Sequence, residues 1–123
     1  MISFHGAWPA LITPATPEGD VETSALRNLT EYLIDKRVDG FYLCGSTGEG
    51  LFQTVEQREL VVEVVMDQVA GRVPVIVHVG CIATRDAVAL ARHAQQAGAD
   101  GVSSVLPALS PSPESVYLHY EAI

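Results

Sequence analysis

Short apolar segments alternate with amphipathic helical segments along the chain, and this alternation restricts the fold more than any other feature of the sequence. Each apolar segment is nearly continuous, which is typical of a strand buried on both faces of a sheet. Strands of this kind, each followed by a helix, form a parallel sheet covered by helices. The predicted strands are residues 8–13, 40–44, 74–79 and 101–105, and the predicted helices are residues 23–36, 54–70, 84–96 and a last one starting at 112.

Capping residues mark the predicted helix boundaries. Thr54 followed by Gln57 is the pattern of a capping box, and Gly71 stands where glycine commonly ends a helix. Thr84 is predicted as an N-cap, as is the serine of the Ser-Pro-Glu sequence at 112–114. The predicted buried positions are Leu26, Leu29, Leu33 and Ile34 in the first helix and Leu60, Val61, Val64 and Val65 in the second.

Four strand–helix units are compatible with two architectures. The loops that follow the strands carry the glycines and hydroxyls, which is the polarity of a (β/α)8 barrel. A flavodoxin-like open sheet also accommodates four units. An ordinary (β/α)8 barrel takes about 250 residues, so four units would make up only about half of one. The chain is then cut from a longer protein, or two halves associate to avoid open sheet edges.

Composition excludes several classes of protein. The formal net charge is −8 and the pI is near 4.7, which argues against nucleic acid and anionic membranes as partners. No apolar run approaches the length of a membrane span, and the N-terminus does not resemble a signal peptide. Two cysteines do not make a disulfide framework, so a reducing cytoplasm is the expected compartment.

The loop at residues 45–50, Gly-Ser-Thr-Gly-Glu-Gly, is the main candidate for a binding site. Ser46 and Thr47 offer hydroxyl donors and adjacent peptide N–H groups, which suit a carboxylate or phosphate. An ordinary turn with glycines for geometry alone remains the alternative. The loop has neither the lysine of a P-loop nor the glycine spacing of a dinucleotide fingerprint. Glu49 is either a base or an acid that braces the loop through backbone N–H groups.

Several segments together resemble the dihydrodipicolinate synthase / N-acetylneuraminate lyase family of Schiff-base aldolases. They are residues 10–14 (ALITP), 38–40 (VDG), 45–49 (GSTGE), 72–76 (RVPVI), 84–87 (TRDA) and 97–102 (AGADGV), which match in order and spacing. The resemblance implies that residues 1–123 are the N-terminal half of a single (β/α)8 TIM barrel domain, about its first four βα units, in a protein that assembles as a homotetramer of two tight dimers. It also implies a lyase or synthase that condenses or cleaves pyruvate or another 2-oxo acid without a cofactor, with Ser46 and Thr47 holding the substrate carboxylate.

Two departures from the family pattern concern catalysis. The family's Schiff-base lysine and one relay tyrosine lie on later strands, beyond Ile123. Lys36 is the only lysine here, on a predicted helix remote from the loops, and an exposed lysine is protonated and a poor nucleophile at neutral pH. The 123 residues alone are therefore expected to be inactive. A second tyrosine, which in the family reaches a neighbouring subunit, is replaced by Leu109, and leucine cannot transfer a proton.

The absent lysine leaves a second function open, a non-catalytic protein of the same fold that binds a 2-oxo acid or acts as a scaffold. Ser46 in place of threonine leans toward the neuraminate-lyase side of the family. No cofactor or metal is expected, because no Asp or Cys completes a zinc pattern with His78. His93 and His119 are interpreted as surface or packing residues, and Cys44 and Cys81 as buried free thiols near each other.

Overall fold

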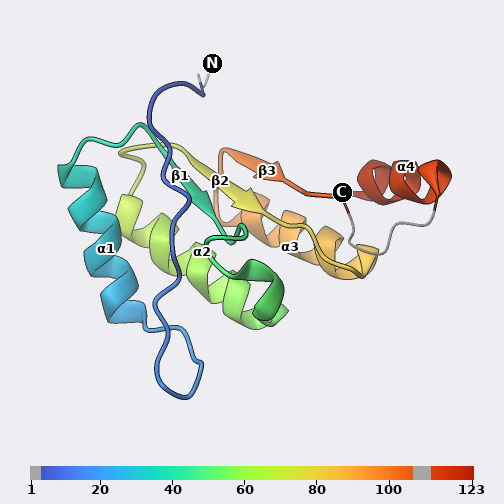
Figure 1. The fold of residues 1–123 in the computed structure, drawn as a ribbon. Coiled ribbons are helices and arrows are strands. Elements are labelled where there is room, and N and C mark those ends of the chain that lie inside the picture. Colours follow the sequence, from blue (N-terminus) through green and yellow to red (C-terminus); the bar gives the residue numbers. More distant parts are fainter. Residues whose placement is uncertain (1–3, 107–111) are drawn as a thin grey trace.

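The computed structural model describes residues 4–106 and 112–123 of the chain, which fold into a parallel sheet with helices packed against it (Figure 1). Strands and helices alternate as the sequence predicts. The elements are α1 (Thr23–Asp35), β1 (Phe41–Leu43), the short 3-10 helix η1 (Gly50–Phe52), α2 (Val55–Val69), β2 (Val75–His78), α3 (Thr84–Gln96), β3 (Gly101–Ser103) and α4 (Pro113–Ala122).

The strands lie in the order β1-β2-β3, with Tyr42 beside Ile76 and Ile76 beside Gly101. The predicted strand at 8–13 is wrong in extent, because only Ala10 forms a parallel bridge, to Tyr42. Prolines at both ends of this segment lack the N–H that a longer ladder needs. The segment still occupies the first place beside β1. Neighbours in space therefore follow chain order, as in a barrel and unlike the 2-1-3 order of a flavodoxin-like sheet.

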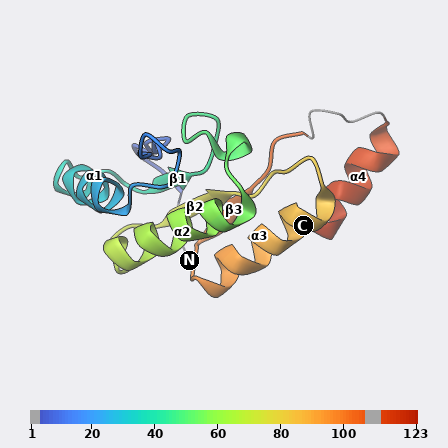
Figure 2. The same ribbon diagram turned by 90° about the horizontal axis from the view of Figure 1, so that it is seen from below.

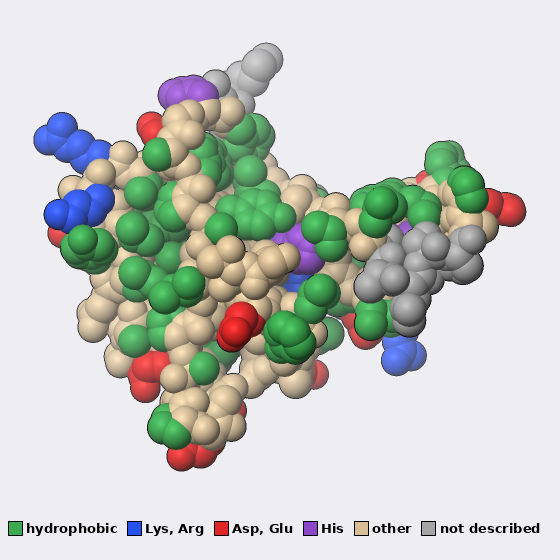
Figure 3. Space-filling view, viewed as in Figure 1, with side chains coloured by type: hydrophobic (Ala, Val, Ile, Leu, Met, Phe, Trp, Pro, Cys, Tyr) green, Lys and Arg blue, Asp and Glu red, His purple; other side chains and the backbone are tan. Residues whose placement is uncertain are grey.

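Helices α1, α2 and α3 lie side by side along one face of the sheet, and α4 extends beyond the end of α3 (Figure 1, Figure 2). Alternate strand residues point into this layer, which explains why Phe41, Leu43, Val75 and Val77 are almost completely buried. Leu26 on α1 is fully buried against them. The opposite face carries no helix among the described residues, and hydrophobic side chains are exposed on it (Figure 3).

Most helix boundaries agree with the predictions. The α2 capping box forms, with the Gln57 N–H donating to Thr54 Oγ1 at 3.2 Å and the Thr54 N–H donating to Gln57 Oε1 at 3.1 Å. Ser112 caps α4 as predicted. Thr84 is not the cap of α3: Ala83 takes that position, and the Thr84 hydroxyl instead bonds His119 Nδ1 at 2.8 Å.

The buried face of α2 is wider than predicted, because α1 and α3 flank this helix on both sides. Val61, Val64 and Val65 are buried as expected, but Leu60 is 37% exposed. The predicted face of α1 is confirmed: Leu26 is buried, and Leu29, Leu33 and Ile34 pack against the core.

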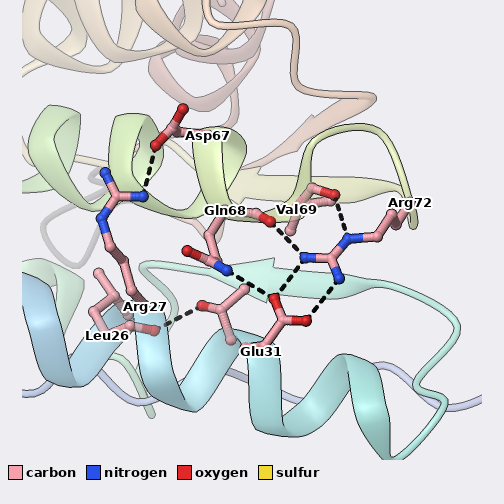
Figure 4. Close-up of polar contacts among 8 residues, drawn as sticks. Leu26, Arg27, Glu31, Asp67, Gln68, Val69 and Arg72 are labelled. Atoms are coloured by element: carbon pink, nitrogen blue, oxygen red, sulfur yellow. Dashed lines mark hydrogen bonds and ion pairs between the residues drawn. The ribbon is translucent and has the colours of Figure 1, made fainter.

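Charged side chains join α1 to α2 and to the turn that follows α2 (Figure 4). Arg27 Nη1 donates to Asp67 Oδ2 at 2.6 Å, and Arg72 donates to both carboxylate oxygens of Glu31 at 2.8 and 2.6 Å. The hydrogen bonds from Arg72 and then Gln68 lower the pKa of Glu31 to about 2. Because both pairs are exposed to solvent, they orient the two helices more than they stabilise the fold.

Candidate functional site

The loop that follows β1 owes its shape to two residues that are not glycine. Cys44 and Glu49 have φ of 57° and 56°, in the left-handed region that glycine usually fills. The three glycines are instead required by close packing. A Cβ on Gly45 would lie 2.6 Å from the Tyr42 ring, one on Gly48 would lie 2.7 Å from a backbone oxygen, and one on Gly50 would lie 2.0 Å from the Cys44 oxygen.

Hydrogen bonds close this loop at its base and leave its outer bend free. The Gly50 N–H donates to the Gly45 oxygen at 3.1 Å, and the Thr13 hydroxyl donates to the Gly48 oxygen at 2.8 Å. Ser46 and Thr47 are exposed. Within residues 4–106 and 112–123 their hydroxyls and backbone N–H groups donate to no protein acceptor. The loop therefore offers several donors on a fixed backbone.

Glu49 is exposed and its carboxylate accepts no hydrogen bond from the described part of the chain. A bracing role through backbone N–H groups is therefore not seen. Lys36 lies at the C-terminal end of α1, where its Nζ sits 5.2 Å from the centroid of the Tyr32 ring. That end of α1 leads into the start of β1, so Lys36 is remote from the loops that follow the strands, as predicted.

Arg58 on α2 is a buried cation that sequence reasoning missed. Its side chain is only 2% exposed, and among the described residues it has no carboxylate partner. The guanidinium donates to the backbone oxygens of Gly80 at 3.0 Å and His78, and to Cys81 Sγ at 3.1 Å. A detectable signal existed, because residues 58, 61, 62 and 65 have the i, i+3, i+4, i+7 spacing of one buried helix face.

His78 connects the ends of all three strands. Its Nδ1 lies 3.1 Å from the Cys44 oxygen, and its Nε2 accepts from the Val105 N–H at 3.3 Å. This pair of contacts assigns the neutral tautomer with the proton on Nδ1. Burial and then the charge of Arg58 lower the pKa of His78, and the bond to Cys44 opposes them. His78 is thus a buried structural residue rather than an exposed ligand.

The two cysteines differ in burial. Cys44 is buried, and that burial raises its pKa to about 11. Cys81 is only partly buried, so the prediction of a buried thiol is confirmed for Cys44 alone. Both thiols are free. The Arg58 guanidinium donates a hydrogen bond to Cys81 Sγ, and its charge opposes the effect of burial on the pKa of Cys44. No group of three potential metal ligands occurs within the residues that the structure describes.

A cavity of about 380 Å³ opens between the loops that follow β1 and β2 and the segment after β3. Leu51, Arg58, Cys81 and Leu106 are among its lining residues, whereas Ser46 and Thr47 are not. The loops that follow the strands therefore border one cavity, but the two predicted ligand residues do not line it.

The remaining sequence candidates lie apart from this site. His93 bonds Glu63 at 3.0 Å between α3 and α2, and His119 is buried against Thr84, so both are packing residues. Leu109, which we expect to replace the family's tyrosine, lies outside the described residues. No helix in the described segments combines the length and the apolar character that crossing a membrane requires.

Comparison with known proteins places this arrangement in a family. The model of the Dihydrodipicolinate synthetase family matches residues 3–123. The chain is 41% identical over 121 residues to a 4-hydroxy-tetrahydrodipicolinate synthase of Syntrophus aciditrophicus, with 98% of this chain and 41% of that protein aligned. It is 38% identical over 122 residues to an N-acetylneuraminate lyase of Escherichia coli O1:K1, with 98% and 41% aligned. The chain thus spans about two fifths of the length of these relatives.

Solved structures give the same result for the fold. An N-acetylneuraminate lyase from Mycoplasma synoviae matches with a TM-score of 0.92 and 31% identity over 97% of this chain and 42% of that one. YagE from E. coli K12, solved in complex with pyruvate, matches with a TM-score of 0.91 and 33% identity over 96% and 40%. These neighbours are TIM barrels, so the prediction that the chain forms part of a (β/α)8 barrel is confirmed. The chain belongs to the dihydrodipicolinate synthetase family.

Proposed function

We propose that this chain is the N-terminal half of a single (β/α)8 barrel domain that makes or cleaves a carbon–carbon bond of pyruvate or a related 2-oxo acid. The observation that carries the proposal is the bend at Ser46 and Thr47, whose hydroxyl and peptide donors find no acceptor among residues 4–106 and 112–123. It lies at the carboxyl ends of the strands, where barrel enzymes bind their substrates. The relatives named as synthase and lyase, and the pyruvate complex of YagE, support the same substrate class.

In the proposed site, Ser46 and Thr47 hold the substrate carboxylate. Hydrogen bonds to an anionic acceptor are about twice as strong as neutral ones, so two hydroxyls and the neighbouring N–H groups would fix it firmly. A fixed carboxylate also fixes the adjacent carbonyl carbon. A lysine amine from residues that follow Ile123 then adds to that carbon and water leaves, which gives the Schiff base. Placing the two reacting groups in this way supplies much of the rate enhancement.

Proton transfer is where we expect this protein to differ from other members. The family's inter-subunit tyrosine is absent at Leu109, so water or another acid would take its part. If that gap limits turnover, Leu109→Tyr should raise the rate of the complete protein, and an unchanged rate would refute this part of the proposal. Ser46 in the loop leans toward the neuraminate-lyase side of the family but does not choose between lyase and synthase. A cytoplasmic homotetramer without a cofactor is proposed from the family resemblance.

The direct test is the intact mass of the complete protein after incubation with pyruvate and borohydride, because borohydride reduces a Schiff base to a stable amine. We expect a pyruvate adduct in the wild type and much less adduct in Ser46→Ala and Thr47→Val at limiting pyruvate. Ser24→Ala, which removes an exposed hydroxyl on α1, is the matched control. Equal adduct in all four proteins would refute the carboxylate site.

The second candidate is a non-catalytic 2-oxo-acid-binding or scaffolding protein. It is favoured by one observation, which is that Lys36 is the only lysine of the 123 residues and lies at the end of α1 that leads into the start of β1. An unmodified wild-type mass together with saturable pyruvate binding by calorimetry would support this candidate. An unmodified mass without pyruvate binding would exclude both the pyruvate-dependent enzyme and a pyruvate-binding protein, and would leave only the scaffolding role.

A further inference from the structure

Two hydroxyls meet on the face of the sheet that no described helix covers. Tyr42 Oη on β1 and Ser103 Oγ on β3 are 2.6 Å apart, and the bond spans the intervening strand β2. Ladder hydrogen bonds already hold the strands, so this bond is not needed to pair them. Its effect is to fix the direction of the Tyr42 ring.

The Tyr42 ring lies directly against the start of the loop. A Cβ added to Gly45 would be 2.6 Å from Tyr42 Cε1 and 3.2 Å from Cδ1, so the ring occupies the space that any side chain at this position would need. Gly45 immediately precedes Ser46, and its oxygen accepts the Gly50 N–H that closes the loop. The ring therefore supports the loop at its closing point.

The backbone of Tyr42 reaches the other side of the same loop. Its oxygen accepts the Leu11 N–H at 2.9 Å, and its N–H donates to the Pro9 oxygen at 3.2 Å. The Leu11 oxygen in turn packs against Gly48, because a Cβ added to Gly48 would lie only 2.7 Å from it. Tyr42 thus contacts the loop just before Ser46, and through Leu11 just after Thr47.

From these contacts we propose that Tyr42 is a positioning residue for the loop that carries Ser46 and Thr47, and that Ser103 holds Tyr42 in place. This inference rests on the proposed function, because the loop is positioned to receive a 2-oxo-acid carboxylate. Loss of the hydroxyl bond leaves the ring in place but free to shift. Small displacements of binding groups reduce both affinity and reactivity, because the reacting atoms must lie within a narrow range of geometry.

The test measures the pyruvate concentration that gives half-maximal borohydride-trapped adduct in the complete protein. Tyr42→Phe and Ser103→Ala each remove one partner of the same bond, and we expect each to raise that concentration about threefold to tenfold. The double variant should be no worse than either single one, because the shared bond can be lost only once. Tyr32→Phe, at an exposed tyrosine on α1, is the matched control and should be neutral.

A suppressor variant tests the packing contact independently. Gly45→Ala should weaken adduct formation by clashing with the ring, and adding Tyr42→Leu should restore part of it by making room. A general loss of stability would not produce this recovery. No recovery, unchanged half-saturation in Tyr42→Phe and Ser103→Ala, or independent effects that multiply in the double variant, would each overturn the inference.

Failure of the proposed function is distinguishable, because the wild type would then form no borohydride-trapped pyruvate adduct. Loop positioning is in that case measured by amide hydrogen exchange of residues 45–50. Tyr42→Phe and Ser103→Ala should accelerate this exchange by the same factor if the inference is correct. Exchange at the wild-type rate in both variants would refute it.

Discussion

Replacing Arg58 by methionine should destabilise the protein through the loop that follows β2. The guanidinium is 2% exposed and donates to the backbone oxygens of His78 and Gly80 and to Cys81 Sγ. Hydrogen bonds from a charged donor contribute roughly 1.5–3 kcal/mol each. Methionine fills much of the volume and removes a desolvated charge, which offsets part of that loss. We expect a net decrease of about 2–4 kcal/mol in the free energy of unfolding.

Urea unfolding of wild type and Arg58→Met measures this difference, and the midpoint of thermal unfolding should fall by roughly 10 °C. Arg85→Met is the control, because the Arg85 side chain is 89% exposed and should change little. A loss below about 1 kcal/mol, or equal losses in both variants, would refute the interpretation of Arg58 as the anchor of this loop.

Three further predictions concern pH and packing. Folding lowers the pKa of His78 from its ordinary value of 6.5. The stability that His78 contributes is therefore complete above pH 6.5 and decreases as the pH falls through the folded pKa. In urea unfolding measured at several pH values, His78→Gln should flatten this dependence. The hydrogen bond from Arg72 is the main reason that the pKa of Glu31 falls from 4.5 to about 2 on folding. The stability that Glu31 contributes is therefore present above pH 4.5 and lost as the pH falls toward 2. Glu31→Gln should lose less free energy of unfolding than the wild type over this pH range. Gly50→Ala should destabilise the protein by about 2 kcal/mol or more, because the new Cβ would lie 2.0 Å from a backbone oxygen. Gly101→Ala is the control and should change little, because its nearest contact would be at 3.6 Å. Equal urea-unfolding midpoints for the two variants would contradict this prediction.

Local patterns predicted most of the fold. The helical periodicity of Leu26, Leu29 and Leu33 and the cap at Thr54 are short-range signals, and the structure confirms them. The strand at 8–13 was overpredicted because apolar character does not reveal that prolines interrupt its ladder. Thr84 was misassigned by one residue because its hydroxyl has a partner on α4, which no local pattern contains.

The site was less predictable than the fold because its contacts join distant segments. Ser46 and Thr47 could be proposed from residue type, and their donors have no acceptor in the part of the chain that the structure describes. Arg58 was missed because charged residues are rarely buried, and only its position in the buried stripe of α2 indicated otherwise. The bond between Tyr42 and Ser103 joins residues 61 positions apart, and only the strand register brings them together.

In the loop after β1, close packing restricts some positions and the backbone dihedral angles restrict others, and this difference determines which substitutions each position tolerates. Positions 45, 48 and 50 are limited by volume, whereas positions 44 and 49 are limited by their backbone dihedral angles. In a library randomised over residues 44–50 and selected for folding, the three glycines should be recovered almost unchanged. Glycine and asparagine should be enriched at the two positions now held by Cys44 and Glu49, since both residues adopt the left-handed conformation readily. The glycines of this loop therefore mark the places where the chain is crowded, and the sharp turns lie beside them.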